Sequence, residues 1–191
     1  MLRMVYFDTE TTGLNPENDR IVEIAAFDAT LNKTFSTLVN PQIPIPKELT
    51  EIHHINDEMV KDAPTFREAG QQFIEFCQTD CVLIAHNCEL FDKPFIAAEF
   101  KRHDLSFPNW IYLDTLKWAR KYRSDLPKHS MQYLREIYEI PPNQAHRALD
   151  DVIILHQLFS KMTGDLSIDQ ILKLLYNNKL TEKSSELLAK S

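Results

Sequence analysis

Short apolar runs, each closed by polar residues, predict where the strands of this chain lie. They cover residues 4–8, 21–28, 33–39, 81–85 and 111–114. Apolar residues at helical spacing predict helices over 65–78, 91–102, 115–123, 130–138 and 148–162. The three early strands follow one another closely, which favours an antiparallel meander. A helix precedes each later strand, which favours parallel pairing. The pattern predicts an α/β fold with a mixed five-stranded sheet flanked by helices.

The first predicted strand ends in two carboxylates, Asp8 and Glu10. Successive side chains of a strand alternate between its faces, so these two project to the same side. Two carboxylates aimed at one point repel each other unless a divalent cation neutralises them. Oxygen ligands suit magnesium or manganese, so the motif indicates a hard-metal site. For an isolated pair, the alternative is an ordinary acidic strand end that runs into a turn.

Two further acidic segments occur where a sheet would bring them toward this pair. Asp92 falls in the first turn of the helix that follows the buried strand 81–85. Asp151 opens the apolar helix that begins near residue 148, so another carboxylate is available to close the site. His146 is five residues earlier, which would put it on a different face of a continuous helix. We expect this histidine on the loop after a proline pair, where it can meet a water molecule as a base.

Three motifs in this order carry a family resemblance: DTETTG from residue 8, HNCELFD from residue 86, and HRALDD from residue 146. Together they resemble the DEDDh exonucleases, which include the proofreading subunit of bacterial replicative DNA polymerase, ribonuclease T and oligoribonuclease. The resemblance runs from Met4 to about Met162 and implies a ribonuclease H-like sheet. The second motif is one residue longer than in the bacterial proofreading subunits, and some stand-alone members share the longer form.

The resemblance implies a role for each of five residues. Asp8, Glu10, Asp92 and Asp151 would bind two Mg²⁺ or Mn²⁺ ions, and His146 would be the general base. Such a two-metal site supports in-line displacement at a phosphodiester. The implied activity is a 3′-5′ exonuclease that releases nucleoside 5′-monophosphates from single-stranded DNA or RNA. The motifs do not decide between the two sugars.

The same resemblance places eight substrate contacts. They are Thr11, Thr12, Gly13, Leu14, His54, Ile55, His86 and Asn87. Gly13 would permit close approach of the chain to the terminal nucleotide, and Leu14 would offer an apolar edge to a base. Alternatives remain open for several of these positions: Leu14 as a core residue, the pair His53 and His54 as structural, and His86 and Asn87 as caps of the helix that begins near Phe91. We interpret Asp114, at the end of the last predicted strand, as a helix cap.

Composition agrees with a folded domain in the cytoplasm. The chain has 191 residues, of which 43% are hydrophobic, and only three glycines. No apolar run approaches the ~18 residues of a membrane span, and the early first strand predicts no signal peptide. The three cysteines match no zinc-site spacing, so we expect reduced thiols. Of these, only Cys88, beside the second motif, could respond to oxidation near the site.

A net charge of −7 is unusual for a protein that would bind a polyanion. The four site acids account for part of it, and their cations would offset them. Basic residues cluster ahead of the third motif: Lys117, Arg120, Lys121, Arg123, Lys128 and His129. A strand of nucleic acid could contact this cluster, although charge runs are often plain solvated helix faces. This distribution favours short or single-stranded substrates held mainly at the 3′ end.

The pattern divides the chain into an exonuclease domain, residues 1–164, and a C-terminal helical tail, residues 165–191. The tail contains an amphipathic helix candidate from Ser167 to Leu175. It could pack on the domain, mediate self-association or bind a polymerase. Two alternative functions follow: a proofreading or assembly subunit active only with its polymerase, and a catalytically silent module that binds nucleic-acid ends.

Overall fold

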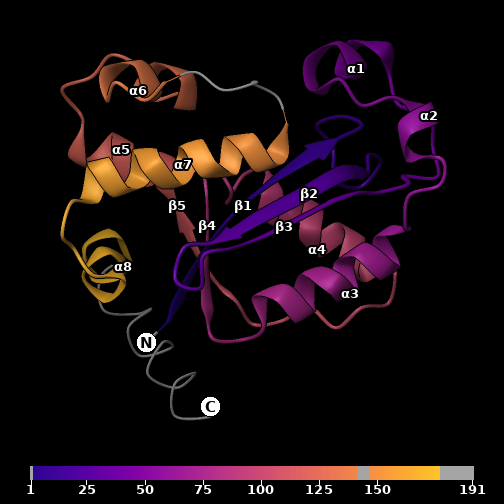
Figure 1. Ribbon diagram of the computed structural model, residues 1–191, viewed down its shortest axis with the longest axis horizontal. Helices are drawn as coiled ribbons and strands as arrows, with labels where there is room; N and C mark the ends of the chain where they lie inside the picture. The colour runs from indigo at the N-terminus through magenta and orange to yellow at the C-terminus, as the bar shows by residue number, and fades with distance from the viewer. Residues whose placement is uncertain (1, 142–146, 177–191) are drawn as a thin grey trace.

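A mixed five-stranded sheet is the centre of the protein in a computed structural model that describes residues 2–141 and 147–176 (Figure 1). Its strands are β1 (Arg3–Thr11), β2 (Ile21–Asp28), β3 (Lys33–Leu38), β4 (Cys81–Ala85) and β5 (Ile111–Asp114). The order across the sheet is β3-β2-β1-β4-β5. β1, β2 and β3 pair antiparallel, whereas β4 and β5 join β1 in parallel. The predicted meander and parallel extension are therefore confirmed.

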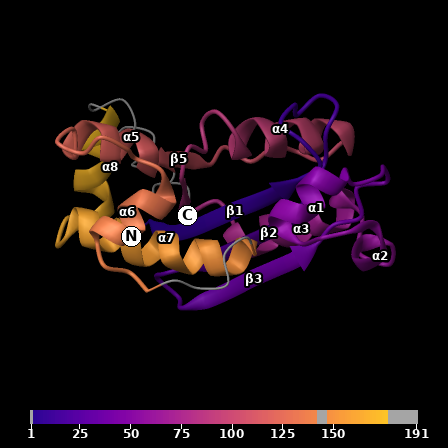
Figure 2. The same cartoon turned by 90° about the horizontal axis from the view of Figure 1, so that it is seen from above.

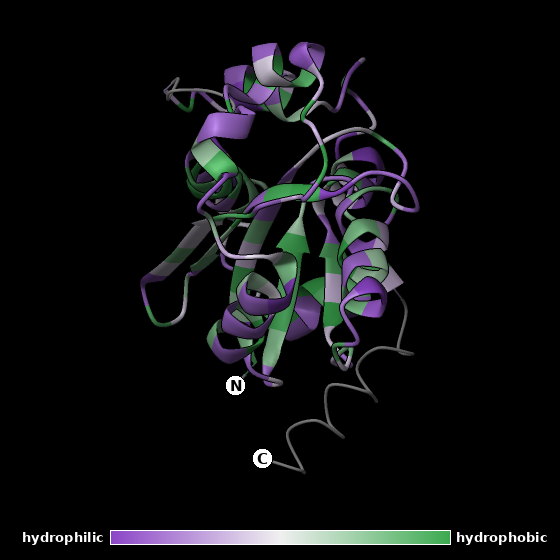
Figure 3. Ribbon diagram, turned by 90° about the vertical axis from the view of Figure 1, so that its right-hand side faces the viewer, coloured by the Kyte–Doolittle hydropathy of each residue, from purple (hydrophilic) through white to green (hydrophobic). Residues whose placement is uncertain are grey.

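Helices cover both faces of this sheet. They are α1 (Lys47–His53), α2 (Asp57–Val60), α3 (Phe66–Cys77), α4 (Asp92–Arg102), α5 (Thr115–Tyr122), α6 (Met131–Ile137), α7 (Ala148–Thr163) and α8 (Ile168–Tyr176). In Figure 2, α4 and α7 lie on opposite sides of β1. The strands between them are mostly apolar, and the outer faces of the helices are mostly polar (Figure 3). This is the layered arrangement that buries both faces of a sheet.

Two successive residues of β1, whose side chains project to opposite faces, show which helix packs on which face of the sheet. The Tyr6 ring contacts His156 of α7 at 5.0 Å between ring centroids, and the adjacent Phe7 ring contacts Phe73 of α3 at 6.2 Å. Asp8 and Glu10 share the parity of Tyr6, so they project to the α7 face. The period-two pattern of this strand therefore determines that its two acids face the start of α7.

The fold differs from the sequence pattern mainly at short elements. β1 continues to Thr11, because pairing with β2 extends that far after an irregularity at Glu10. α1 and α2 were not predicted, since helices of seven and four residues are too short to show an apolar period. In the part of the chain that the structure describes, no helix has the length and apolar character needed to cross a membrane.

α8 belongs to the main core. Ile168, Ile171 and Leu172 are buried in the same apolar cluster as the central strands. The hydroxyl of Tyr176 accepts a hydrogen bond from the backbone N–H of Asp114, at 3.1 Å, where β5 ends. Of the three alternatives for the tail, packing on the domain therefore holds for residues 168–176. A division of the chain at residue 164 stays a prediction, and residues 177–191 lie outside the described part.

Candidate active site

Three carboxylates meet where β1 ends and α7 begins. One oxygen each of Asp8, Glu10 and Asp151 can be chosen so that all three lie within 4.8 Å of one another. Strand alternation aims Asp8 and Glu10 at α7, and Asp151 lies in the first turn of that helix. An oxygen donor set of this size and charge fits a hard divalent cation. The structure thus brings together three of the four predicted metal ligands.

Asp92 approaches the same strand from the other face of the sheet. It is buried in the first turn of α4, and its Oδ1 accepts a hydrogen bond from the Thr9 hydroxyl at 2.7 Å. Thr9 does point away from its acidic neighbours, as strand alternation requires, and in doing so it orients the fourth acid. Asp92 also raises the pKa of Asp8, so the two carboxylates are close enough to interact.

Burial and mutual repulsion both disfavour the ionised form of this cluster. Burial is the largest cause in each case, followed for Asp8 by the charges of Asp92 and Glu10. The pKa of Asp8 is raised well above its usual range, that of Glu10 to about 8, and that of Asp92 to about 6. A divalent cation would reverse this preference, because it stabilises the ionised carboxylates that bind it.

Glu23 is a fifth carboxylate beside the cluster, it is fully buried, and the sequence analysis did not identify it. It pairs directly with Glu10 across β1 and β2. One oxygen accepts from the guanidinium of Arg147 at 3.1 Å, and the other from the backbone N–H of Ala148 at 3.2 Å. Arg147 directly follows His146 in the sequence, so Glu23 anchors the chain at the start of α7. An acid within the apolar run of β2, well before the strand ends at Asp28, was the available signal.

Asp114 organises the second motif from the end of β5. Its Oδ1 accepts hydrogen bonds from the backbone N–H groups of Leu116 and Lys117, which confirms the predicted helix cap on α5. The same carboxylate accepts from the backbone N–H groups of Asn87 and Glu89, at 3.0 and 3.2 Å. Asp114 therefore holds the loop that leads to Asp92, in addition to capping a helix.

His86 and Asn87 have structural partners within the described residues. The two ring nitrogens of His86 are hydrogen-bonded to the Thr115 hydroxyl and to the His129 backbone carbonyl, both at 2.9 Å. Asn87 has a left-handed backbone with φ 66°, which asparagine tolerates well. The residue before α4 is Phe91, and no side chain caps that helix, so the cap alternative for Asn87 is wrong. Contact of either residue with a nucleotide stays a prediction.

The loop after Glu10 presents one exposed apolar side chain. Leu14 is 81% exposed, so the core alternative for this residue is wrong and its side chain is free to meet a base. Thr11 and Thr12 are buried, and the Thr11 hydroxyl donates to the Gly13 carbonyl at 2.6 Å. A Cβ at Gly13 would collide with the carboxylate of Asp19. Gly13 is therefore required by the close packing of its own loop against Asp19. Contact of these residues with substrate stays a prediction.

The segment between α1 and α2 places its predicted residues differently. His54 is exposed and ends α1 with a left-handed backbone of φ 59°. Ile55 is fully buried in a small apolar cluster with Val22, Ile45 and Val60. The neighbouring His53 is also buried, and its Nδ1 accepts from the backbone N–H of Ile55 at 3.1 Å. His54 therefore has the freer side chain, and contact of either predicted residue with substrate is untested.

His146 lies outside the described residues, so its predicted role as the base is carried forward as a proposal.

All three cysteines are free and buried, and burial raises the pKa of Cys88 far above its usual range. No disulfide joins them, and their reduced state stays a prediction. A buried Cys88 in the protonated form is a poor sensor of oxidation, because the thiolate is the reactive species.

Comparison with known proteins places this site in a family. The family model described as Exonuclease matches residues 5–159. The chain belongs to the exonuclease family. It is a nuclease of the DnaQ-like 3′-5′ type, as the order of its three motifs indicated.

Two curated relatives and one solved structure show how far the similarity extends. This exonuclease is 41% identical to a PolC-type DNA polymerase III of Caldanaerobacter subterraneus subsp. tengcongensis, over 85% of the chain but only 12% of the polymerase. It is 38% identical to the DNA polymerase III subunit epsilon of Treponema pallidum, over 82% of the chain and 74% of that subunit. Exonuclease X in complex with 5′ overhanging duplex DNA has 28% identity and a TM-score of 0.66, and the match covers 90% of this chain and 99% of that one.

Proposed function

We propose that this exonuclease removes nucleoside 5′-monophosphates one at a time from the 3′ end of single-stranded DNA or RNA. The observation that carries the proposal is the convergence of Asp8, Glu10 and Asp151 within 4.8 Å, beside an Asp92 oriented by Thr9. These four acids would hold two Mg²⁺ or Mn²⁺ ions. When bound, the ions supply charge stabilisation at the phosphodiester and make water a better nucleophile.

The residues of the chain then have separate tasks. The exposed Leu14 side chain would face the terminal base and limit how far the strand enters. His146 would accept the proton of the attacking water as the new phosphorus–oxygen bond forms. The bond from phosphorus to the 3′ oxygen of the preceding nucleotide breaks, and that oxygen takes a proton from solvent. An unperturbed histidine pKa of about 6.5 suits this transfer near neutral pH.

The first test uses 5′-labelled DNA and RNA of equal sequence, with magnesium, manganese or a chelator. The protein should give a metal-dependent ladder that shortens from the 3′ end. The Asp8→Ala variant should give none while keeping its fold, since Asp8 is central to the acidic cluster. The ratio of the two rates measures the sugar preference. Intact substrate in every lane would contradict the proposal.

The role of His146 has its own test. We expect His146→Ala to lower kcat by about 10²-fold or more, with little change in the affinity for 3′ ends or for metal. Fluorescence anisotropy with a labelled oligonucleotide measures the affinity, and single-turnover hydrolysis measures the chemical step. An equal loss of affinity and rate would count against His146 as the base.

A proofreading subunit that works with a polymerase is the second candidate. It is favoured by relatives named PolC-type DNA polymerase III and DNA polymerase III subunit epsilon. The discriminating measurement is the rate of the isolated chain on single-stranded DNA. A rate that rises only when a replicative polymerase is added would support the subunit. A silent end-binding module is disfavoured, because all four acids of the motifs are present.

A further inference from the structure

The five lysines and arginines of the basic cluster ahead of the third motif divide into two groups. Lys117 forms an ion pair with Glu89, and Arg123 forms one with Asp125. Lys121 donates a hydrogen bond to a backbone carbonyl of α8. These three cations have partners within the protein, so they are not the ones available to a polyanion.

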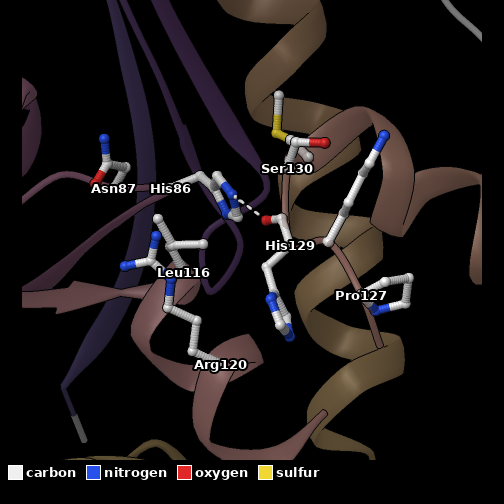
Figure 4. A pocket seen from close by; sticks show the side chains of 9 residues that line it. His86, Asn87, Leu116, Arg120, Pro127, His129 and Ser130 are labelled. Carbon is white, nitrogen blue, oxygen red and sulfur yellow. Dashed lines mark hydrogen bonds between the residues drawn. The ribbon is translucent and has the colours of Figure 1, made fainter. Parts of the chain in front are cut away.

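Arg120 and Lys128 form the second group. Across residues 2–141 and 147–176, neither side chain takes part in an ion pair, and both residues are exposed. Both line a pocket of ≈ 550 Å³ between α5 and the segment that leads into α6. In Figure 4 the Arg120 side chain extends alongside Leu116 toward the side of the pocket where Asn87 lies. No carboxylate lines this pocket, so its lining carries net positive charge.

The second catalytic motif forms one wall of this pocket. His86 and Asn87 line it, and the bond from His86 to the His129 carbonyl closes that wall (Figure 4). His86 follows β4, and α5 follows β5, which are parallel to β1. The pocket therefore lies at the same edge of the sheet as Asp8 and Glu10, the edge where parallel strands end.

We infer that this pocket binds backbone phosphates of the substrate strand on the 5′ side of the scissile bond, with Arg120 and Lys128 as the phosphate ligands. The inference rests on the proposed function and adds the direction in which the strand leaves the site. A strand whose 3′ end lies at the acidic cluster must extend across a protein of net charge −7. An acid-free pocket with two free cations at the same edge is a favourable place for its next phosphates, and arginine binds phosphate through paired N–H groups.

The test compares a long oligothymidylate with the dinucleoside monophosphate TpT, whose only phosphate is the scissile one. In Arg120→Ala/Lys128→Ala, the preference for the long substrate, taken as the ratio of the two kcat/KM values, should fall by about tenfold. The slope of log kcat/KM against log salt for the long substrate should become shallower by about 1.4, since each single-strand phosphate contact contributes about 0.7.

Two matched variants control for charge and folding. Lys33→Ala/Lys173→Ala removes the same charge from exposed residues of β3 and α8, and it should leave both the preference and the slope unchanged. Arg120→Lys/Lys128→Arg keeps the two charges in place and should restore most of the preference. Circular dichroism verifies that each variant folds.

The outcomes separate this inference from the proposed function. Normal hydrolysis with an unchanged preference in Arg120→Ala/Lys128→Ala would overturn the inference and leave the proposed function in place. Absence of hydrolysis by the unaltered protein would contradict the proposed function. In that case the binding of a fluorescent oligothymidylate is measured by anisotropy for the unaltered protein and for Arg120→Ala/Lys128→Ala. Weaker and less salt-sensitive binding by the double variant would support the inference. Equal binding by the two proteins would overturn it.

Discussion

Glu23 shows how one charged residue in an apolar strand can determine the position of a distant segment. All eight residues of β2 are buried, and Glu23 is 1% exposed. Its carboxylate would be costly there without partners, and it has two at the start of α7. The sequence displays the anomaly, but the partners lie 124 and 125 residues away. No local pattern could therefore have named Arg147 and Ala148.

Replacement of Glu23 should affect both stability and turnover. Glu23→Gln replaces one oxygen by an NH₂ group, which must face either the Arg147 guanidinium or the Ala148 N–H, and both are donors. We expect a loss of about 1–3 kcal/mol in unfolding free energy, and a lower kcat with little change in KM. Urea unfolding and steady-state kinetics measure these. Glu75→Gln, on the exposed face of α3, is the matched control. If Glu23→Gln changes stability and kcat no more than the control does, the contacts of Glu23 with the start of α7 are unimportant for both.

The acidic cluster makes stability depend on pH in an unusual direction. The pKa of Glu10 is raised from 4.5 to about 8, mainly by burial and then by the charge of Asp151. The folded protein therefore binds this proton more tightly than the unfolded chain does. The stabilisation is fully present below pH 4.5 and is lost as pH rises through about 8. A carboxylate whose pKa is lowered by an ion pair in the folded protein has the opposite effect.

We therefore expect Tm in a chelator to fall between pH 5 and 8, and magnesium to restore it at the upper end. A change of 1 kcal/mol corresponds to about 2–4 °C for a chain of this size. Glu10→Gln cannot ionise, so its Tm should vary less over this window. Thermal unfolding followed by circular dichroism makes the comparison. Equal pH dependence in the two proteins would rule out Glu10 as the source.

At the scale of elements, the apolar pattern located all five strands, and it missed only two helices within the described residues. α3, α4, α5, α6 and α7 each begin and end within about one residue of their predicted bounds. α2 is capped by the Asn56 side chain, which accepts from the Met59 N–H, and α1 ends at His54 with a left-handed cap. Such caps leave no period in the sequence. The convergence of Asp8, Glu10 and Asp151 was predictable because strand parity and helix starts determine it.

α8 offers an element-level test, because its two faces differ. Ile171 is 2% exposed in the main core, whereas Leu174 on the same helix is 41% exposed. Ile171→Ala should lower the unfolding free energy by about 2–5 kcal/mol, and Leu174→Ala by much less. Urea unfolding of both variants gives the comparison. Equal effects would mean that α8 contributes little to the core in solution.

At the scale of the whole molecule, the active site depends on contacts between the two ends of the described chain. Asp8 belongs to the first strand, and Asp151 belongs to the helix that follows every strand. α7 packs on both β1 and β2. The four acids come from β1, α4 and α7, so the site requires segments from most of the described chain.

Activity should therefore report global folding. In a urea titration, the midpoint of activity loss should coincide with the midpoint measured by circular dichroism, as expected for a two-state domain. Activity lost well before the fold would indicate that the start of α7 opens independently of the sheet. Glu23→Gln, which weakens that anchor, should then widen the gap between the midpoints.

The late position of α7 has a consequence during protein synthesis. A ribosome releases β1 early, with Asp8 and Glu10 already on it, and releases the third motif only after all five strands. Chain segments emerge in sequence order and fold as units once complete. A nascent chain that has released all five strands but not α7 therefore carries three of the acids without Asp151, and we expect it not to hydrolyse nucleic acid. The order of the motifs along the gene delays the appearance of nuclease activity until the domain is finished.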